Sequence, residues 1–238
     1  MIPIFLRDLA LRLVLVVLAG IMFYLLEPAF HYHGPVAADL SAQLSAGGIA
    51  ATLANLAGLS MLILLAGFIS TDRRRGYYRI YFSHPTRPLV FYGVRWLLAL
   101  ALAMGAAAIF LVLGQFAAWG EFRGGLGGLW LALLSALAYG GLIAFLSAAL
   151  PRADGWVAVL IFLFTYFWLQ AISLGATPLT APIRQILNFI LPPQTALQDI
   201  YIAVIGSGTA WGAAAFVFGY SVFWLVVAAL LLRLREWP

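Results

Sequence analysis

Long apolar runs alternate with short polar stretches along the whole chain. A helix of about 20 residues crosses the roughly 30 Å hydrocarbon core of a bilayer, and six of the runs reach that length. We expect spans at residues 9–29, 47–70, 89–116, 126–150, 156–176 and 210–232. The pattern predicts an all-α polytopic membrane protein, with residues 1–238 forming a single transmembrane domain.

The segment before the last span, residues 177–208, holds two shorter apolar pieces. Residues 183–191 are too few to span, and Pro192 and Pro193 end this piece because proline cannot continue a helix. Residues 200–205 form the second piece. We interpret both as external half-helices that re-enter the bilayer, with a gate at Ile190, Leu191, Pro192 and Pro193. An amphipathic loop without a gating role accounts for the same pattern.

The composition agrees with a membrane protein and excludes several activities. Hydrophobic residues make up 65% of the chain and charged residues 9%. There is no cysteine, so disulfides and thiolate chemistry are excluded. Every basic side chain is an arginine, and without lysine the chain has no Walker A phosphate loop and no Schiff-base chemistry.

The arginines lie mostly on one side of the expected spans. Cytoplasmic loops carry an excess of basic residues, so this bias predicts that both termini and residues 71–88 are cytoplasmic and that the protein is integral to the cell (cytoplasmic or inner) membrane. Arg95, inside the third span, is expected to extend back to the membrane surface. The cytoplasmic set is Arg7, Arg12, Arg73, Arg74, Arg75, Arg79, Arg87, Arg95, Arg152, Arg233 and Arg235, against Arg123 and Arg184 on the other side.

The polar residues do not form a catalytic constellation. All three histidines fall in predicted loops, and Glu27 is the single acid within a span, near its outer end. We therefore expect no catalytic residue, no bound metal and no enzymatic activity of this chain by itself. Aromatic faces with a few polar groups suit amphipathic or sugar-like cargo, although lipid-facing packing explains any single ring equally well. The residues that would line such a path are Asn55, Ser60, Phe164, Tyr166, Phe167, Trp168 and Gln170.

Small residues recur every four positions in the third span, at Ala99, Ala103 and Ala107. Such rows let helix backbones approach closely. Either packing inside the bundle or an interface with another subunit accounts for them.

A basic and aromatic island, Thr71–Pro88, separates the second and third spans. It reads TDRRRGYYRIYFSHPTRP, and Gly76 permits a tight change of direction after the arginine run. An ordinary cytoplasmic loop bound to anionic lipid, worth about 1 kcal/mol for each arginine near the surface, is one interpretation.

The arrangement within the island is more specific. An acid-Arg-x-x-Gly motif, a short helix and then Ser-x-Pro-x-Arg resemble the permease subunits of ATP-binding-cassette transporters of the second class (ABC type 2). In that family the loop between spans two and three forms a coupling helix that docks on the ATPase. Tyr77, Tyr78 and Arg79 stand where the family often has a small or acidic residue and then an apolar one. The matching positions are Asp72, Arg73, Gly76, Ser83, Pro85 and Arg87, and the resemblance adds Tyr77, Arg79, Tyr81 and Phe82 as ATPase contacts.

The resemblance implies the permease subunit of an ATP-driven exporter. Its partners would be two ABC ATPase subunits, a second permease, expected to be a second copy of the same chain, and membrane lipids, with no nucleic acid. The chain itself would hold no cofactor, and ATP and Mg would bind to the ATPase. The alternative from another class is a non-transporting membrane scaffold or assembly factor, whose basic loop recruits a protein or anionic lipid.

Overall fold

The computed structural model describes residues 2–27, 30, 38–76, 87–150, 153–173, 181–206 and 208–234, in which every regular element is a helix. The helices are α1 (Ile2–Leu26), α3 (Ala38–Leu65), α4 (Ser70–Arg75), α6 (Pro88–Trp119), α7 (Gly127–Ala149), α8 (Asp154–Ser173), α9 (Ala181–Ile190), α10 (Gln194–Ile205) and α11 (Trp211–Leu234).

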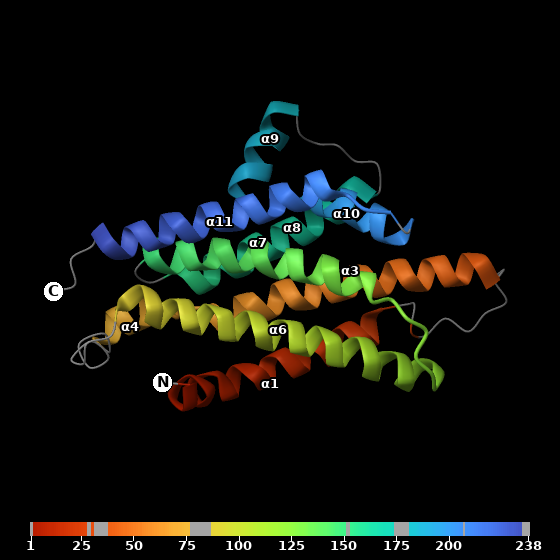
Figure 1. Cartoon of the computed structure of the whole chain (residues 1–238), viewed down its shortest axis with the longest axis horizontal. Coiled ribbons are helices and arrows are strands. Elements are labelled where there is room, and N and C mark those ends of the chain that lie inside the picture. The colour runs from red at the N-terminus through yellow and green to blue at the C-terminus, as the bar shows by residue number, and fades with distance from the viewer. Residues whose placement is uncertain are drawn as a thin grey trace.

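The long helices lie side by side along the longest axis of the molecule (Figure 1). Helices α3 and α7 pack along each other at the centre, with α1 and α6 on one side and α11 and α10 on the other. The start of α1, the short helix α4 and the end of α11 all lie at one end of the bundle. Helix α10 lies towards the opposite end.

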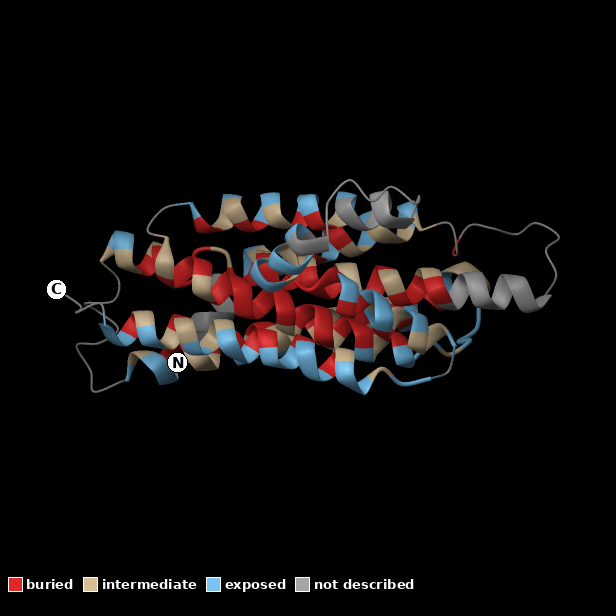
Figure 2. Cartoon of the chain, turned by 90° about the horizontal axis from the view of Figure 1, so that it is seen from above, coloured by how far each residue is buried: buried red, intermediate tan, exposed pale blue. Residues whose placement is uncertain are grey.

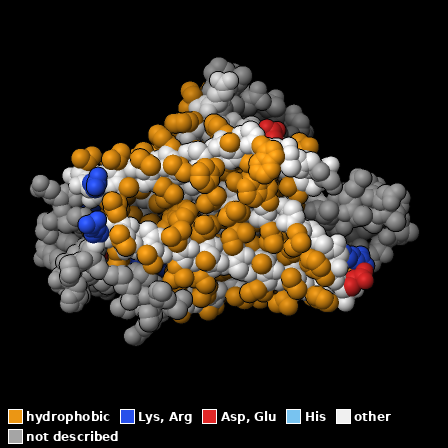
Figure 3. Space-filling model, in the orientation of Figure 1, with side chains coloured by type: hydrophobic (Ala, Val, Ile, Leu, Met, Phe, Trp, Pro, Cys, Tyr) orange, Lys and Arg blue, Asp and Glu red, His pale blue; other side chains and the backbone are white. Residues whose placement is uncertain are grey.

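Within the described residues, five helical segments are long and apolar enough to cross a membrane, so the chain has the character of a helical membrane protein. They are Leu9–Leu26, Gly47–Arg75, Pro88–Trp119, Gly127–Ala149 and Trp211–Leu234. The apolar part of α8 over Asp154–Phe167 is shorter, and the sixth span stays a prediction. Figure 3 shows an apolar surface across the middle of the bundle, with charged side chains at its two ends and beside the short helices.

Buried residues concentrate along the middle of the bundle, in α3 and α7 above all (Figure 2). Small residues make this close packing possible. A Cβ at Gly128 of α7 would lie 3.1 Å from the Cα of Ala50 on α3. Ala99, Ala103 and Ala107 of α6 are fully buried within this one chain, so their row serves packing inside the bundle.

The sequence predicted one continuous helix over residues 47–70, and the structure shows that this helix is broken. Helix α3 ends at Leu65, a turn follows, and α4 begins at Ser70. Gly67 in the turn has φ of 72°, a conformation that costs glycine little.

Two short helices, α9 and α10, occupy the segment before α11. Helix α10 begins at Gln194 and is therefore longer than the apolar piece predicted at residues 200–205. Their entry into the bilayer stays a prediction.

We expect Gly141→Ala to destabilise the bundle. A Cβ at Gly141 would lie 2.8 Å from the backbone oxygen of Ser221 and 3.0 Å from its Cα on α11. Backbone cannot move aside as a side chain can, and overpacking of this kind costs about 1–3 kcal/mol. The thermal unfolding midpoint of the purified protein in detergent should fall. Gly219→Ala on α11, where nothing lies within 4 Å, is the matched control and should leave the midpoint unchanged or raise it slightly, because alanine favours a helix over glycine. Equal midpoints for the two variants would contradict the packing described.

Candidate functional site

The α3–α4 junction, residues 63–72, exposes backbone carbonyls where α3 ends. The last carbonyls of a helix have no donor within the helix and carry its negative dipole end. The guanidinium of Arg12 on α1 donates from Nη1 to the carbonyl oxygens of Ile63 at 3.2 Å, Leu64 at 2.9 Å and Ala66 at 2.7 Å. A cation from a neighbouring helix therefore binds the end of α3.

The backbone N–H groups of the α3–α4 junction are bound from α7 and α8. Asp154 accepts the N–H of Gly67 at 2.9 Å through Oδ2 and the hydroxyl of Ser70 at 2.8 Å through Oδ1. The hydroxyl oxygen of Ser147 accepts the N–H groups of Ile69 at 3.1 Å and Ser70 at 3.2 Å. Both acceptor side chains are buried, and hydrogen bonds are stronger where the local dielectric is low.

Asp72 on α4 and Arg95 on α6 form a buried ion pair. Nη1 of Arg95 lies 2.8 Å from Oδ2 of Asp72, and each side chain is only 8% exposed. The same Nη1 donates to the carbonyl oxygen of Phe68 at 3.1 Å, and the hydroxyl of Tyr92 donates to Oδ2 of Asp72 at 3.5 Å. The expectation that Arg95 extends back to the membrane surface is therefore wrong. A carboxylate within the bundle gives its charge a partner, as a buried charge requires.

The three arginines of α4 differ in their surroundings. Arg73 donates from Nη1 to the carbonyl oxygen of Ala148 on α7 at 3.2 Å, whereas Arg74 and Arg75 are exposed. Gly76 ends α4 with φ of 70°. Helix α4 thus faces the bundle with Asp72 and Arg73 and presents further positive charge outward.

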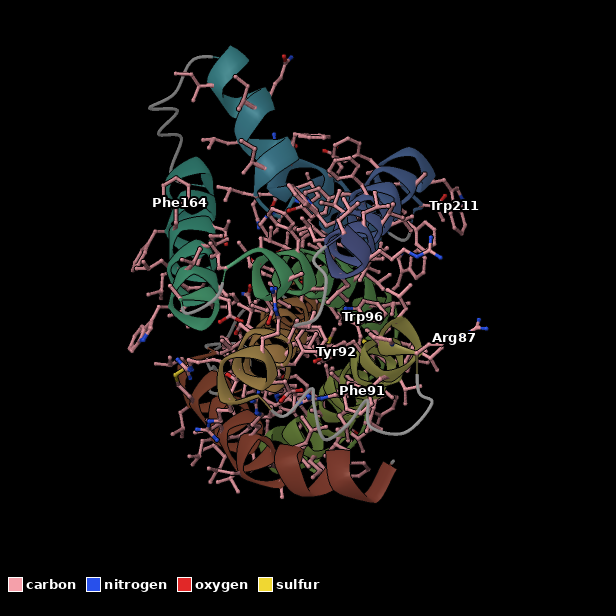
Figure 4. The ribbon with its side chains drawn as sticks, turned by 90° about the vertical axis from the view of Figure 1, so that its left-hand side faces the viewer. Arg87, Phe91, Tyr92, Trp96, Phe164 and Trp211 are labelled. Atoms are coloured by element: carbon pink, nitrogen blue, oxygen red, sulfur yellow. The ribbon has the colours of Figure 1, made fainter. Side chains whose placement is uncertain are left out.

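Ten residues were predicted to contact an ATPase, and the structure describes Asp72, Arg73, Gly76 and Arg87 among them. Asp72 is turned into the bundle and paired with Arg95, and its part in ATPase docking stays a prediction. Arg87 precedes α6, is exposed and points away from Tyr92 and Trp96, which point into the bundle (Figure 4). The remaining six lie outside the described residues: Tyr77, Arg79, Tyr81, Phe82, Ser83 and Pro85.

A second feature is a polar cavity of about 230 Å³ between α3, α7, α8 and α10. None of the described residues that line it carries a charge, and its polar groups are carboxamides and hydroxyls. The lining residues are Ala51, Ala54, Asn55, Leu131, Ser135, Tyr139, Tyr166, Gln194, Leu197, Gln198 and Tyr201.

A chain of hydrogen bonds fixes one wall of the polar cavity. Nε2 of Gln194, which is 5% exposed, donates to the hydroxyl of Tyr139 at 3.4 Å. The Tyr139 and Thr165 hydroxyls are 2.6 Å apart, and the Thr165 hydroxyl donates to the carbonyl oxygen of Ile161 at 2.9 Å. A hydroxyl has one proton to give, so in the arrangement where Thr165 donates to this carbonyl, Tyr139 donates to Thr165. The chain then runs in one direction, away from Gln194.

Two of the residues predicted to line a substrate path, Asn55 and Tyr166, do line the polar cavity. Ser60 does not, because it is fully buried in α3, and its hydroxyl has no hydrogen-bond partner in the described part of the chain. Ser60 therefore does not line this cavity, and its place on a substrate path stays a prediction.

The aromatic residues of α8 are placed differently from the expectation. Phe164 and Phe167 do not line the polar cavity and are exposed, Phe167 to 65%. Phe164 lies on α8 at the edge of the bundle (Figure 4). The side chains of Trp168 and Gln170 lie outside those that the structure describes.

The predicted gate residues form the turn between α9 and α10. Pro192 and Pro193 are buried, whereas Ile190 is exposed and Leu191 is half-buried. The hydroxyl of Tyr220 on α11 donates to the carbonyl oxygen of Ile190 at 3.1 Å. The turn is thus fastened to α11, and its gating role stays a prediction.

Glu27 is not among the lining residues of the polar cavity but lies close enough to act on Tyr201, and it is bound to Thr52 of α3. Its Oε2 accepts the hydroxyl of Thr52 at 2.6 Å. Burial raises the pKa of Tyr201 on α10 above its usual value, and the negative charge of Glu27 raises this pKa further. A raised pKa keeps the phenol protonated, so Tyr201 presents a neutral hydroxyl at physiological pH.

Sequence reasoning missed Arg12, Ser147 and Asp154 as ligands of the broken helix, and Tyr139 and Gln194 as cavity residues. The available signal was weak. Arg12 and Asp154 are charged residues that lie within one helical turn of the end of an apolar run. Charges at such positions typically mark only the boundary of a span, so they did not indicate a ligand of the broken helix.

Comparison with models of known protein families, with curated proteins and with solved structures finds no match to this chain.

We expect single replacements in the Asp72–Arg95 pair to be costly. Asp72→Asn or Arg95→Met leaves an uncompensated buried charge, which costs about 3–5 kcal/mol. The double variant should lose less than the sum of the single losses, because the two sites interact. Unfolding of the purified protein by sodium dodecyl sulfate in mixed micelles measures these free energies.

The exposed pair of Glu121 and Arg123, joined at 2.9 Å with side chains 65% and 54% exposed, is the matched control. The cycle of Glu121→Gln and Arg123→Met should give a coupling of about 0.2–1 kcal/mol. Additive losses at Asp72 and Arg95 would show that the ion pair does not stabilise the α3–α4 junction.

Proposed function

We propose that this chain is the permease subunit of an ATP-driven exporter of the ABC type 2 family, coupled to separate ATPase subunits. The observation that carries the proposal is the α3–α4 junction. Helix α4 bears three consecutive arginines, and the junction that holds it is hydrogen-bonded to α1, α6, α7 and α8. Helix α4 exposes positive charge on its outer side, and its junction with α3 is hydrogen-bonded to four helices of the bundle. A protein bound to α4 could therefore move these helices when it moves α4.

The docking surface would combine α4 with the segment that follows it. Exposed arginines make strong charge-assisted contacts with acidic groups, and Arg74, Arg75 and Arg87 are exposed at this end of the bundle. Arg79 would add to them. Tyr77, Tyr81 and Phe82 would fill a groove on the ATPase, while Ser83 and Pro85 would shape the segment. We place the docking contacts on these residues and the positioning of α4 on Asp72, Arg73 and Gly76.

The coupling would work through two arrangements of the α3–α4 junction. Closure of the ATPase dimer around ATP would push on residues 71–88, and the helices fastened to them would rearrange. Such a shift needs contacts that differ between the two states. Gly67 supplies a left-handed backbone conformation at the bend, where a few residues can absorb a change of direction.

The distribution of arginine supports a cytoplasmic location for the α4 end. The start of α1, α4 and the end of α11 share this end (Figure 1). An excess of arginine marks the cytoplasmic side of a membrane protein. Among the described side chains, Arg12, Arg73, Arg74, Arg75, Arg87, Arg95 and Arg233 belong to this end, and Arg123 to the opposite one.

The transport path would lie between this chain and a second permease, a second copy of itself in our proposal. ATP and Mg would bind to the two ATPase subunits, because the chain has no lysine for a phosphate loop. The re-entrant helices at residues 177–208 and the gate at the Pro192–Pro193 turn belong to this proposal. The alternative is a non-transporting scaffold that recruits a protein or anionic lipid through the same arginines, and the absence of transport would favour it.

Replacing the exposed arginines should release the ATPase. Arg74→Ala/Arg75→Ala/Arg87→Ala removes three charge-assisted contacts, each worth about 1.5–3 kcal/mol. We expect at least a tenfold loss of the co-purified Walker A-containing ATPase when the variant chain is affinity-purified from its native host. Nucleotide-dependent transport in vesicles should fall in parallel.

The control is Arg123→Ala/Arg233→Ala, which removes two exposed arginines outside the docking surface and should leave ATPase recovery unchanged. Full recovery and full transport with the triple variant would overturn the coupling assignment. Binding of anionic vesicles that depends on the same three arginines, with no ATPase recovered by the unaltered chain, would favour the scaffold.

A further inference from the structure

The polar cavity has a lining of uncharged side chains, both polar and apolar. It presents three carboxamides and three phenols, with alanine and leucine side chains between them, in a volume of about 230 Å³. Ligand sites combine apolar walls with a few placed polar groups in this way. The carboxamides belong to Asn55, Gln194 and Gln198, and the phenols to Tyr139, Tyr166 and Tyr201.

The surroundings of the polar cavity favour an uncharged ligand. An isolated ion is very costly to bury without a partner, and the described lining supplies neither a cation nor an anion. Glu27, an acid near the cavity, accepts a hydrogen bond from Thr52. The hydroxyl of Tyr201 is neutral, as derived above. An anionic group would therefore leave water without gaining a counterion, and a cationic group would have only Glu27, which does not line the cavity and already accepts a hydrogen bond from Thr52.

The hydrogen-bonding capacity left in the polar cavity matches hydroxyl groups. Because the chain from Gln194 through Tyr139 to Thr165 runs in one direction, the carboxamide oxygen of Gln194 remains an acceptor, with no donor in the described part of the chain. Asn55 makes no side-chain hydrogen bond within that part either. A carboxamide offers both a donor and an acceptor. A hydroxyl, which also donates and accepts, can satisfy both functions.

The size of the polar cavity and its aromatic rings fit a single polyhydroxylated ring. A water molecule takes roughly 30 Å³ of liquid, so the cavity replaces several waters and has room for one sugar ring. Sugar rings carry hydroxyls at the edge and C–H groups on the faces. The carboxamides can bond the edge while the phenol rings of Tyr166 and Tyr201 cover a face.

We propose that this cavity binds an uncharged, hydroxyl-rich group such as a sugar ring, either free or as the head group of a membrane amphiphile. The role of this group as cargo rests on the proposed transport function, whereas its binding does not. Gln194 and Asn55 are the residues that select it.

The test uses the full chain in phosphatidylcholine nanodiscs, prepared without sugar detergents and without ATPase. Binding of methyl β-glucoside and octyl β-glucoside is followed by saturation-transfer NMR. We expect saturable binding that octyl sulfate and octyltrimethylammonium, which share the octyl tail, do not displace. Binding of both glucosides indicates a site for free sugar, and binding of octyl β-glucoside alone indicates a site for a membrane-borne head group. No saturable binding of either glucoside, or equal displacement by the charged octyl compounds, overturns the proposal.

Variants locate the binding. Gln194→Leu and Asn55→Leu should each weaken glucoside binding about fivefold to tenfold, as expected for one lost hydrogen bond. Gln185→Leu on α9, an exposed carboxamide that does not line the polar cavity, is the control and should bind as the unaltered chain does. If Gln194→Leu does not fold, Asn55→Leu, at a half-buried position, carries the test. Unchanged affinity in the folded variants overturns the proposal. Failure of ATPase docking contradicts the transport function and leaves this binding result standing.

Discussion

A helix that breaks inside a bundle must find partners for the backbone groups that the break releases. Water is scarce there, and each unpaired group costs free energy. Where α3 ends and α4 begins, the partners come from four other helices. Arg12 of α1 and Arg95 of α6 bind carbonyls, and Asp154 of α8 and Ser147 of α7 bind N–H groups. The Asp72–Arg95 pair then holds α4 against α6. These contacts make the break a fixed structural feature, and they place most of the buried charge of the described chain at one end.

The polar cavity, by contrast, is lined by neutral polar groups among the described residues. The polar cavity relies on carboxamides and hydroxyls, and the one-way chain from Gln194 to Thr165 orders its wall without any charge. The two regions share α3, α7 and α8. A displacement at the α3–α4 junction therefore has continuous helices through which to reach the cavity, and this arrangement connects the proposed docking surface to the proposed ligand site.

The apolar runs were enough to predict a helical membrane protein, because membrane-length helices follow directly from hydrophobicity and length. Contacts between distant residues could not be predicted in the same way. Arg95 and Asp72 are 23 residues apart in the sequence, so the sequence alone suggested a surface position for Arg95. Gln194 and Tyr139 are 55 residues apart. The aromatic run of α8 has rings on every face, so its sequence could not show that Tyr166 lines the cavity while Phe167 is exposed.

The central claim is that the α3–α4 junction carries a change from α4 to the polar cavity. The chain has no cysteine, so Gln198→Cys gives a single reporter thiol at the cavity. Its rate of reaction with a membrane-impermeant maleimide is measured in the complex with ATPase, with and without a non-hydrolysable ATP analogue. We predict a rate that depends on nucleotide, and a loss of that dependence when Asp154→Asn removes one acceptor from the junction while ATPase remains bound. The account would be contradicted if nucleotide did not change the labelling rate of Gln198→Cys. It would also be contradicted if nucleotide changed that rate equally with and without Asp154→Asn.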